Sequence, residues 1–148
     1  IGLRKLKKKW MKLSIKNVRT MSLNWSMILA IGVGGFIGSI ARAYAVHVTN
    51  RYFPIEFPLG ILLVNLVGSF LAGVLFAYFS NYPLSVNLKA FLTTGFLGAL
   101  TTYSTFAIES YLLWGTSIYI AIANITLNLV GTILAAGGGF KLMHFFLK

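Results

Sequence analysis

The chain has 148 residues, of which 57% are hydrophobic and only 10% are charged, and its mean hydropathy is +0.82. This composition argues against a water-soluble domain and is typical of a membrane protein. The net charge of +11 is concentrated at one end, because eight of the 13 lysine and arginine residues lie within the first 19 positions. The absence of cysteine excludes disulfides and thiolate metal sites.

Residues 1–25 are predicted to form a basic N-terminal arm. Its leucines and Trp10 recur at helical spacing among the lysines, which favours a helix lying on anionic lipid. A disordered leader is an alternative, and so is a signal peptide cleaved near residues 43–45 (AYA). A basic segment attached to a membrane span favours a topology signal over nucleic-acid binding, and it predicts a cytoplasmic N-terminus.

Four apolar stretches are long enough to cross a hydrocarbon core about 30 Å thick. They predict one transmembrane domain over residues 26–148, with helices at 27–47, 59–79, 89–113 and 115–140. The connections are short and contain proline and asparagine, so consecutive helices are expected to pack as antiparallel neighbours. Small residues four apart predict close helix approach, within the subunit or between subunits, at Gly34 and Gly38, Gly68 and Ala72, and Gly131 and Ala135.

Two of the spans carry polar side chains at helical spacing. Asn65 and Ser69 share one face of the second span, and Asn124, Asn128 and Thr132 form a polar stripe along the fourth. Polar groups in a membrane are costly unless they have a partner or face water. The stripe favours a polar path over the alternative, which is hydrogen bonding between helices.

The third span has an unusual centre, GALTTYST at residues 98–105. Glycine weakens a helix, and threonine and serine side chains compete for its backbone hydrogen bonds. The segment therefore predicts a helix broken at mid-membrane, whose freed carbonyl groups can hold a cation. A continuous helix with inward-facing threonines is the alternative.

Three motifs follow one another along the chain: GGFIGSIAR at 34–42, NLVGSFLAG at 65–73 and GALTTYSTF at 98–106. In this order they resemble the first helix, the second helix and the GxxTTFSTF signature of the small bacterial fluoride channels (Fluc, also called CrcB). The resemblance covers most of the chain after the arm. It implies a non-enzymatic, multi-pass protein of the bacterial plasma membrane that exports fluoride passively through an antiparallel, dual-topology dimer of four-helix subunits.

The resemblance also implies roles for individual residues. A structural sodium ion at the dimer centre would bind the backbone carbonyls of Gly98 and Thr101, and Arg42 and Glu109 would lie in the vestibules. The two pore aromatics correspond to Tyr103 and Phe106. The full ion pathway implied by the resemblance comprises Asn65, Tyr103, Ser104, Phe106, Asn124, Asn128 and Thr132.

Some positions depart from the family pattern. Asn124 and Asn128 replace the usual Tyr and Ser of the polar track, and Tyr103 replaces the first pore phenylalanine. The basic arm opposes insertion in both orientations, so a homodimer and a heterodimer with a related chain of opposite topology both stay open.

Two other functions are compatible with a chain of this kind. A small drug/proton antiporter needs a carboxylate in the membrane, for which Glu109 is the one intramembrane candidate. A non-conducting partner subunit would use the polar stripes to contact neighbouring helices instead of ions.

Overall fold

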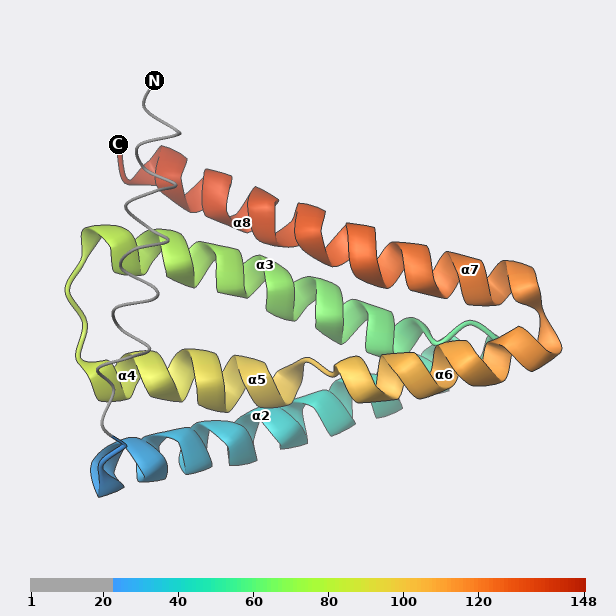
Figure 1. Ribbon diagram of the computed structural model, residues 1–148, viewed down its shortest axis with the longest axis horizontal. Helices are drawn as coiled ribbons and strands as arrows, with labels where there is room; N and C mark the ends of the chain where they lie inside the picture. Colours follow the sequence, from blue (N-terminus) through green and yellow to red (C-terminus); the bar gives the residue numbers. More distant parts are fainter. Residues whose placement is uncertain (1–22) are drawn as a thin grey trace.

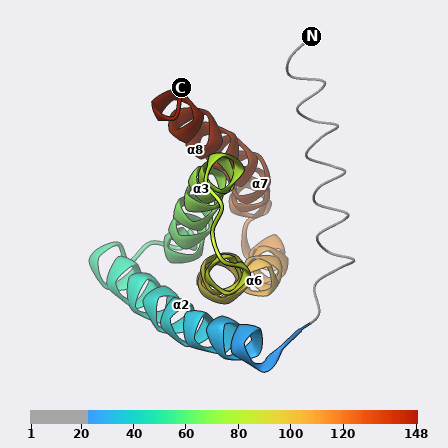
Figure 2. The same ribbon diagram turned by 90° about the vertical axis from the view of Figure 1, so that its left-hand side faces the viewer.

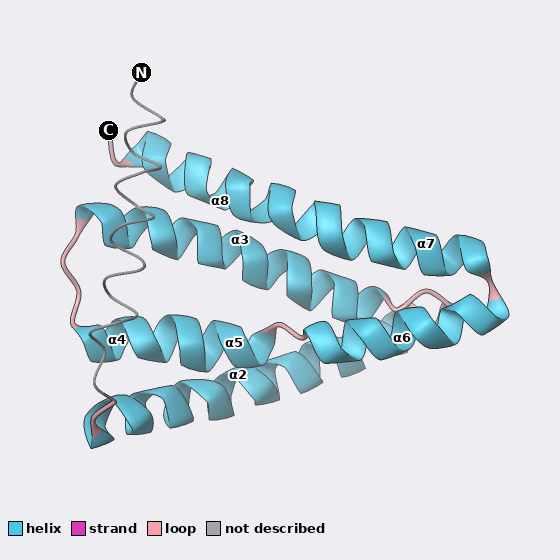
Figure 3. Ribbon diagram, viewed as in Figure 1, coloured by secondary structure: helices cyan, strands magenta, loops and turns pink. Residues whose placement is uncertain are grey.

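The computed structural model describes residues 23–148, and every regular element among them is helical (Figure 3). The predicted arm, up to residue 22, lies outside the described residues. In chain order the elements are α2 (Trp25–Tyr52), α3 (Leu59–Asn81), α4 (Val86–Ala90), η1 (Phe91–Leu97), α5 (Gly98–Leu100), α6 (Tyr103–Thr116), α7 (Ile118–Thr126), η2 (Leu127–Gly131) and α8 (Thr132–Phe146), where η1 and η2 are π-helical.

Among the described residues, three helices are long and apolar enough to cross a membrane. They are α2 (Trp25–Tyr52), α3 (Leu59–Asn81) and the continuous run of α7, η2 and α8 (Ile118–Phe146). The stretch predicted as the third span is instead covered by α4, η1, α5 and α6. Residues 23–148 are therefore all-helical, with several membrane-capable helices. A fourth crossing, made by the divided segment, stays a prediction.

The ends of α2 follow from local chemistry. The Asn24 side chain accepts a hydrogen bond from the Met27 backbone N–H at 2.8 Å, which satisfies one of the free donors of the first turn. The helix continues to Tyr52, beyond the predicted end at residue 47. It stops there because Pro54 disfavours helical backbone at Phe53, which adopts φ −127° and ψ 74°.

The helices form an elongated bundle in which α3 packs along α8 and α2 packs along η1 and α5. Figures 1 and 2 show α2 and α8 on opposite sides of the bundle, with α3 between them. The start of α2 and the end of α8 lie at the same end of the molecule (Figure 1). This arrangement brings the middle of α3, the α5–α6 junction and η2 together.

Glycines allow two of these pairs of helices to touch backbone to backbone. A Cβ atom added to Gly73 would meet the Ala136 carbonyl oxygen of α8, and one added to Gly139 would meet the Phe70 carbonyl oxygen of α3. At Gly34 and Gly38 the atoms met belong to the backbone of η1. These glycines therefore pack within the subunit, which was one of the two alternatives for the Gly34 and Gly38 pair.

We expect Gly139→Ala to destabilise the protein and Gly138→Ala to leave its stability equal or slightly higher. The new methyl group at 139 collides with backbone, at a cost of about 1–3 kcal/mol, whereas nothing lies within 4 Å of a Cβ at 138. Thermal unfolding in detergent, followed by size-exclusion chromatography, measures both variants. Equal loss in the two would contradict the packing of α8 on α3.

Candidate functional site

The site is organised around a two-residue interruption between α5 and α6. Thr101 (φ −84°, ψ 153°) and Thr102 (φ −147°, ψ 117°) have extended backbone, so the helix stops at Leu100 and starts again at Tyr103. The Thr102 hydroxyl caps the new helix by accepting a hydrogen bond from the Thr105 N–H at 3.3 Å. The interruption lies within the segment that the sequence marked as weak.

This interruption removes the helical donors of two carbonyl groups. In an uninterrupted α-helix the Gly98 carbonyl accepts from the N–H of Thr102, and the Thr101 carbonyl accepts from the N–H of Thr105. Here the Thr102 N–H donates to Asn65 Oδ1 at 2.8 Å, and the Thr105 N–H donates to a side chain. Gly98 and Thr101 are also the residues whose carbonyls the family resemblance assigned to sodium.

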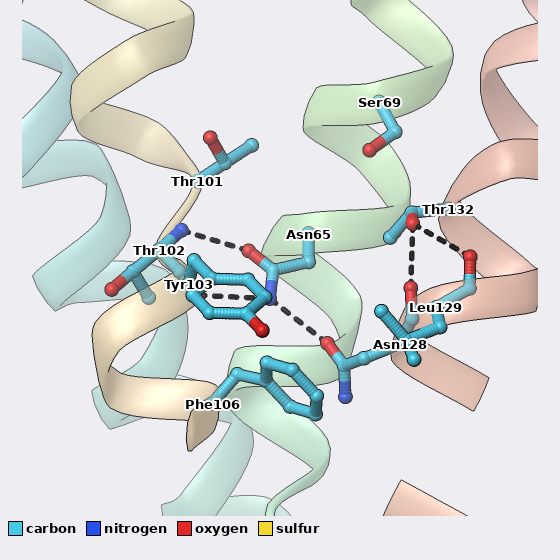
Figure 4. A pocket seen from close by; sticks show the side chains of 9 residues that line it. All are labelled: Asn65, Ser69, Thr101, Thr102, Tyr103, Phe106, Asn128, Leu129 and Thr132. Carbon is cyan, nitrogen blue, oxygen red and sulfur yellow. Dashed lines mark hydrogen bonds between the residues drawn. The ribbon is translucent and has the colours of Figure 1, made fainter. Parts of the chain in front are cut away.

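Asn65 of α3 makes hydrogen bonds to the backbone of the interruption. Its side chain is only 7% exposed. Its Oδ1 accepts from the Thr102 N–H, while its Nδ2 donates to the Thr102 carbonyl at 3.2 Å and to Asn128 Oδ1 at 2.9 Å. Figure 4 shows the amide lying between the interruption and η2. One side chain thus satisfies both polar groups of the Thr102 backbone.

A partly open pocket of about 190 Å³ lies beside this amide (Figure 4). Its walls come from α3, the interruption, α6, η2 and α8, and they combine hydroxyl, amide and aromatic groups. The lining residues are Asn65, Ser69, Thr101, Thr102, Tyr103, Phe106, Asn128, Leu129 and Thr132. The pocket therefore offers polar contacts next to apolar ring edges.

The two aromatic residues of the pocket differ strongly in exposure. The Phe106 side chain is 5% exposed, whereas that of Tyr103 is 73% exposed. Their ring centroids lie 5.4 Å apart with the planes at 70°, an edge-to-face arrangement. One ring is thus fixed in the subunit and the other faces outward from it.

Most of the predicted pathway residues lie together in this pocket, but two do not line it. Ser104 is exposed, with its hydroxyl 3.4 Å from that of Thr102. Asn124 is 0% exposed and donates from Nδ2 to Ser110 Oγ at 2.9 Å. The predicted residues that do line the pocket are Asn65, Tyr103, Phe106, Asn128 and Thr132.

The polar stripe makes hydrogen bonds inside the subunit. Asn128 Nδ2 donates to Asn124 Oδ1 at 2.9 Å, and the Thr132 hydroxyl donates to the Asn128 carbonyl at 2.5 Å. Asn128 also accepts from Asn65, which links η2 to α3. Interhelical hydrogen bonding, the alternative to a polar path, is therefore present at Asn124 and Asn128.

The two charged residues predicted for the vestibules have different surroundings. Arg42 lies inside α2, ten positions before its last residue, and its Nη1 donates to the Thr101 carbonyl at 3.4 Å. Glu109 follows Phe106 by one turn of α6, and its Oε2 is buried without a hydrogen-bond partner among residues 23–148. Arg42 thus adds a positive charge beside one of the freed carbonyls.

Ser69, Thr102 and Leu129 also line the pocket, although they were not among the predicted site residues. Ser69 had a signal in the sequence, because it shares a helix face with Asn65. Thr102 had one as well, because threonine before a helical run is a typical N-cap. Ser110 bonds to Asn124 across two helices, and no spacing in the sequence indicates that contact.

Known proteins of one family match most of the length of this chain. The sequence model of the family described as "CrcB-like protein, Camphor Resistance (CrcB)" matches residues 29–140. A protein from Sulfurimonas denitrificans is 53% identical over 128 residues, which is 85% of this chain and 99% of the relative. A Campylobacter jejuni protein is 46% identical over 114 residues, covering 76% and 93% of the two chains.

A third relative, from Nautilia profundicola, is 43% identical over 128 residues, which is 85% of this chain and all of the relative. All three relatives are named "Fluoride-specific ion channel FluC". The family match covers most of the described helices, including the interruption and the pocket around it. On this basis the chain belongs to the CrcB family.

Proposed function

We propose that the protein is a fluoride-specific ion channel that lets cytoplasmic fluoride leave the cell by passive diffusion. The observation that carries the proposal is the agreement between family membership and a pocket of hydroxyl, amide and aromatic groups at the interrupted helix. Export needs no covalent chemistry, so the protein is not an enzyme. Its setting is the bacterial plasma membrane, with the N-terminus predicted to be cytoplasmic.

The proposed pathway runs along the pocket. Aromatic rings carry partial positive charge at their edges, so the edges of Tyr103 and Phe106 can stabilise an anion that has lost water. Ser69 and Thr132 line the same space, although the Thr132 hydroxyl donates to the Asn128 carbonyl. Ser104 lies on the first turn of α6, with its hydroxyl 3.4 Å from that of Thr102. A narrow path lined by hydrogen-bond donors favours fluoride over the larger chloride ion.

The exposure of Tyr103 supports an assembly of two subunits. Its ring is 73% exposed and lines a partly open pocket, so a second antiparallel subunit would complete the wall. Such a dimer would contain two pathways. A homodimer and a pair of related chains with opposite topology are both compatible with this arrangement.

The freed carbonyls of Gly98 and Thr101 fit a sodium ion, because unwound backbone supplies the hard oxygen ligands that such ions prefer. When bound, the ion would offset the repulsion between fluoride ions in neighbouring pathways. Arg42 already places one positive charge at the Thr101 oxygen. The proposed ion would therefore share that carbonyl with a fixed guanidinium group.

Purified protein in liposomes is expected to release fluoride without a pH gradient and to release no chloride. Phe106→Ile is expected to lower the fluoride flux by about tenfold or more, because it removes the buried ring edge from the path. Phe145→Ile, at an exposed position near the end of α8, is the matched control and should keep full flux. An ion-selective electrode measures the release.

Two results would contradict the proposal. One is drug exchange driven by a proton gradient without fluoride movement, which would indicate an antiporter. The other is an undiminished flux in Phe106→Ile. If the chain alone releases no fluoride, the assay is repeated with a related chain of opposite topology added. Absence of fluoride release from that mixture would also count against the channel.

Replacing sodium by a large organic cation on both sides of the membrane is expected to destabilise the assembled protein. A ligand present at about 100 times its Kd stabilises by about 2.7 kcal/mol, so its loss lowers the unfolding temperature measurably. Thermal unfolding is followed in sodium and in N-methylglucamine at equal ionic strength. Identical unfolding temperatures would speak against a structural sodium ion.

A further inference from the structure

Five hydrogen bonds in series connect the interruption to the first turns of α6 through three other elements. The Thr102 N–H donates to Asn65, Asn65 to Asn128 at 2.9 Å, and Asn128 to Asn124 at 2.9 Å. Asn124 then donates to Ser110 Oγ at 2.9 Å, and Ser110 donates to the Phe106 carbonyl at 2.8 Å. We call the four side chains of Asn65, Asn128, Asn124 and Ser110 the amide network.

The network begins and ends on one segment of the chain. It starts at Thr102, the N-cap of α6, passes through α3, η2 and α7, and returns to α6 at Ser110. All four side chains are buried, at 7% exposure or less. Hydrogen bonds in such a shielded setting are strong, and each member restrains the next.

The amides of Asn65 and Asn128 already have protein partners for their donors. Asn65 Nδ2 donates to the Thr102 carbonyl and to Asn128 Oδ1, and Asn128 Nδ2 donates to both Asn124 oxygens, at 2.9 Å and 3.1 Å. A side-chain amide has two N–H groups. Either residue could therefore donate to an ion only by giving up an internal bond.

The direction of the network is set by the backbone groups at its two ends, because the Thr102 N–H can only donate and the Phe106 carbonyl can only accept. The Ser110 hydroxyl hydrogen is used on the Phe106 carbonyl, so its oxygen presents lone pairs to Asn124. Asn124 must then turn Nδ2 towards Ser110 and Oδ1 towards Asn128. Asn128 in turn presents Oδ1 to Asn65, which leaves Nδ2 as the group that Asn65 can offer. Ser110 and Asn124 thus complete the bonds that hold Asn128, while the Thr102 N–H sets the orientation of the Asn65 amide.

We propose that Ser110 and Asn124 are positioning residues, which hold Asn128 and Phe106 at the pocket wall without touching the transported ion. The inference rests on the proposed channel function. Neither residue lines the pocket, whereas both residues that they hold do. In a chain that carries Asn at 124 and 128, the amide network would set the geometry on which fluoride selectivity depends.

Ser110→Ala is expected to lower fluoride flux by about fivefold, the effect of losing roughly one hydrogen bond, and to lower the fluoride-to-chloride flux ratio. Ser110→Thr keeps the hydroxyl and should restore both values. Ser80→Ala is the matched control, because the Ser80 hydroxyl also bonds the carbonyl four residues earlier but lies at the exposed end of α3. Monodisperse protein is used throughout, so a change in selectivity reports geometry rather than yield.

Thiol labelling locates Ser110 independently of flux. The chain contains no cysteine, so Ser110→Cys and Thr132→Cys each carry a single thiol. A small, water-soluble thiosulfonate reagent should label Thr132→Cys in the pocket and leave Ser110→Cys unmodified. Labelling of both at similar rates would place position 110 in the pathway and overturn the proposal.

Flux and selectivity equal to wild type in both Ser110→Ala and Asn124→Leu would also overturn it. Asn81→Leu is the control for the second variant, because Asn81 is exposed and donates only to a carbonyl of its own helix. Absence of fluoride flux in the wild type would instead contradict the proposed function. In that case the labelling result still decides whether Ser110 is shielded from water.

Discussion

The hydrogen bonds between Asn65 and the Thr102 backbone are the interaction on which the site depends. Two residues of extended backbone inside an apolar bundle leave polar groups without helical partners, and in hydrocarbon no water can replace them. The Asn65 amide meets both the N–H and the carbonyl of Thr102, at 2.8 Å and 3.2 Å. This side chain compensates for the non-helical backbone at that position, and by accepting from the Thr102 N–H it leaves the Gly98 carbonyl without its helical donor.

The bundle holds this amide in place through backbone contact between helices. Gly73 and Gly139 bring α3 against α8, while Gly34 and Gly38 bring α2 against η1. Interiors packed this closely allow little adjustment of the elements that they carry. These glycines thus determine where Asn65 of α3 lies relative to η2 and to the interruption.

Much of this arrangement was accessible from the sequence. Composition and the length of the apolar stretches indicated an all-helical membrane protein, and the GALTTYST segment contains the interruption because glycine and hydroxyl side chains weaken a helix locally. Polar side chains four apart on two helices indicated that polar faces would meet. Each of these signals depends only on residues within a single helix or span.

Other features could not be predicted because they depend on how separate elements are placed. The bond between Asn124 and Ser110 joins α7 to α6, and the contact of Arg42 with Thr101 joins residues 59 positions apart. Spacing along one helix gives the face of a side chain but not its partner. The sequence therefore favoured a polar path for a stripe whose amides are largely used in bonds within the subunit.

The unequal exposure of Tyr103 and Phe106 has a consequence for genetics. In the proposed dimer each conduit would be a composite, with one ring anchored in its own subunit and the other reaching into the shared boundary. A defective copy would then impair conduits built partly from healthy copies. Such a gene would show dominant-negative behaviour when mixed alleles are expressed, although each product folds normally.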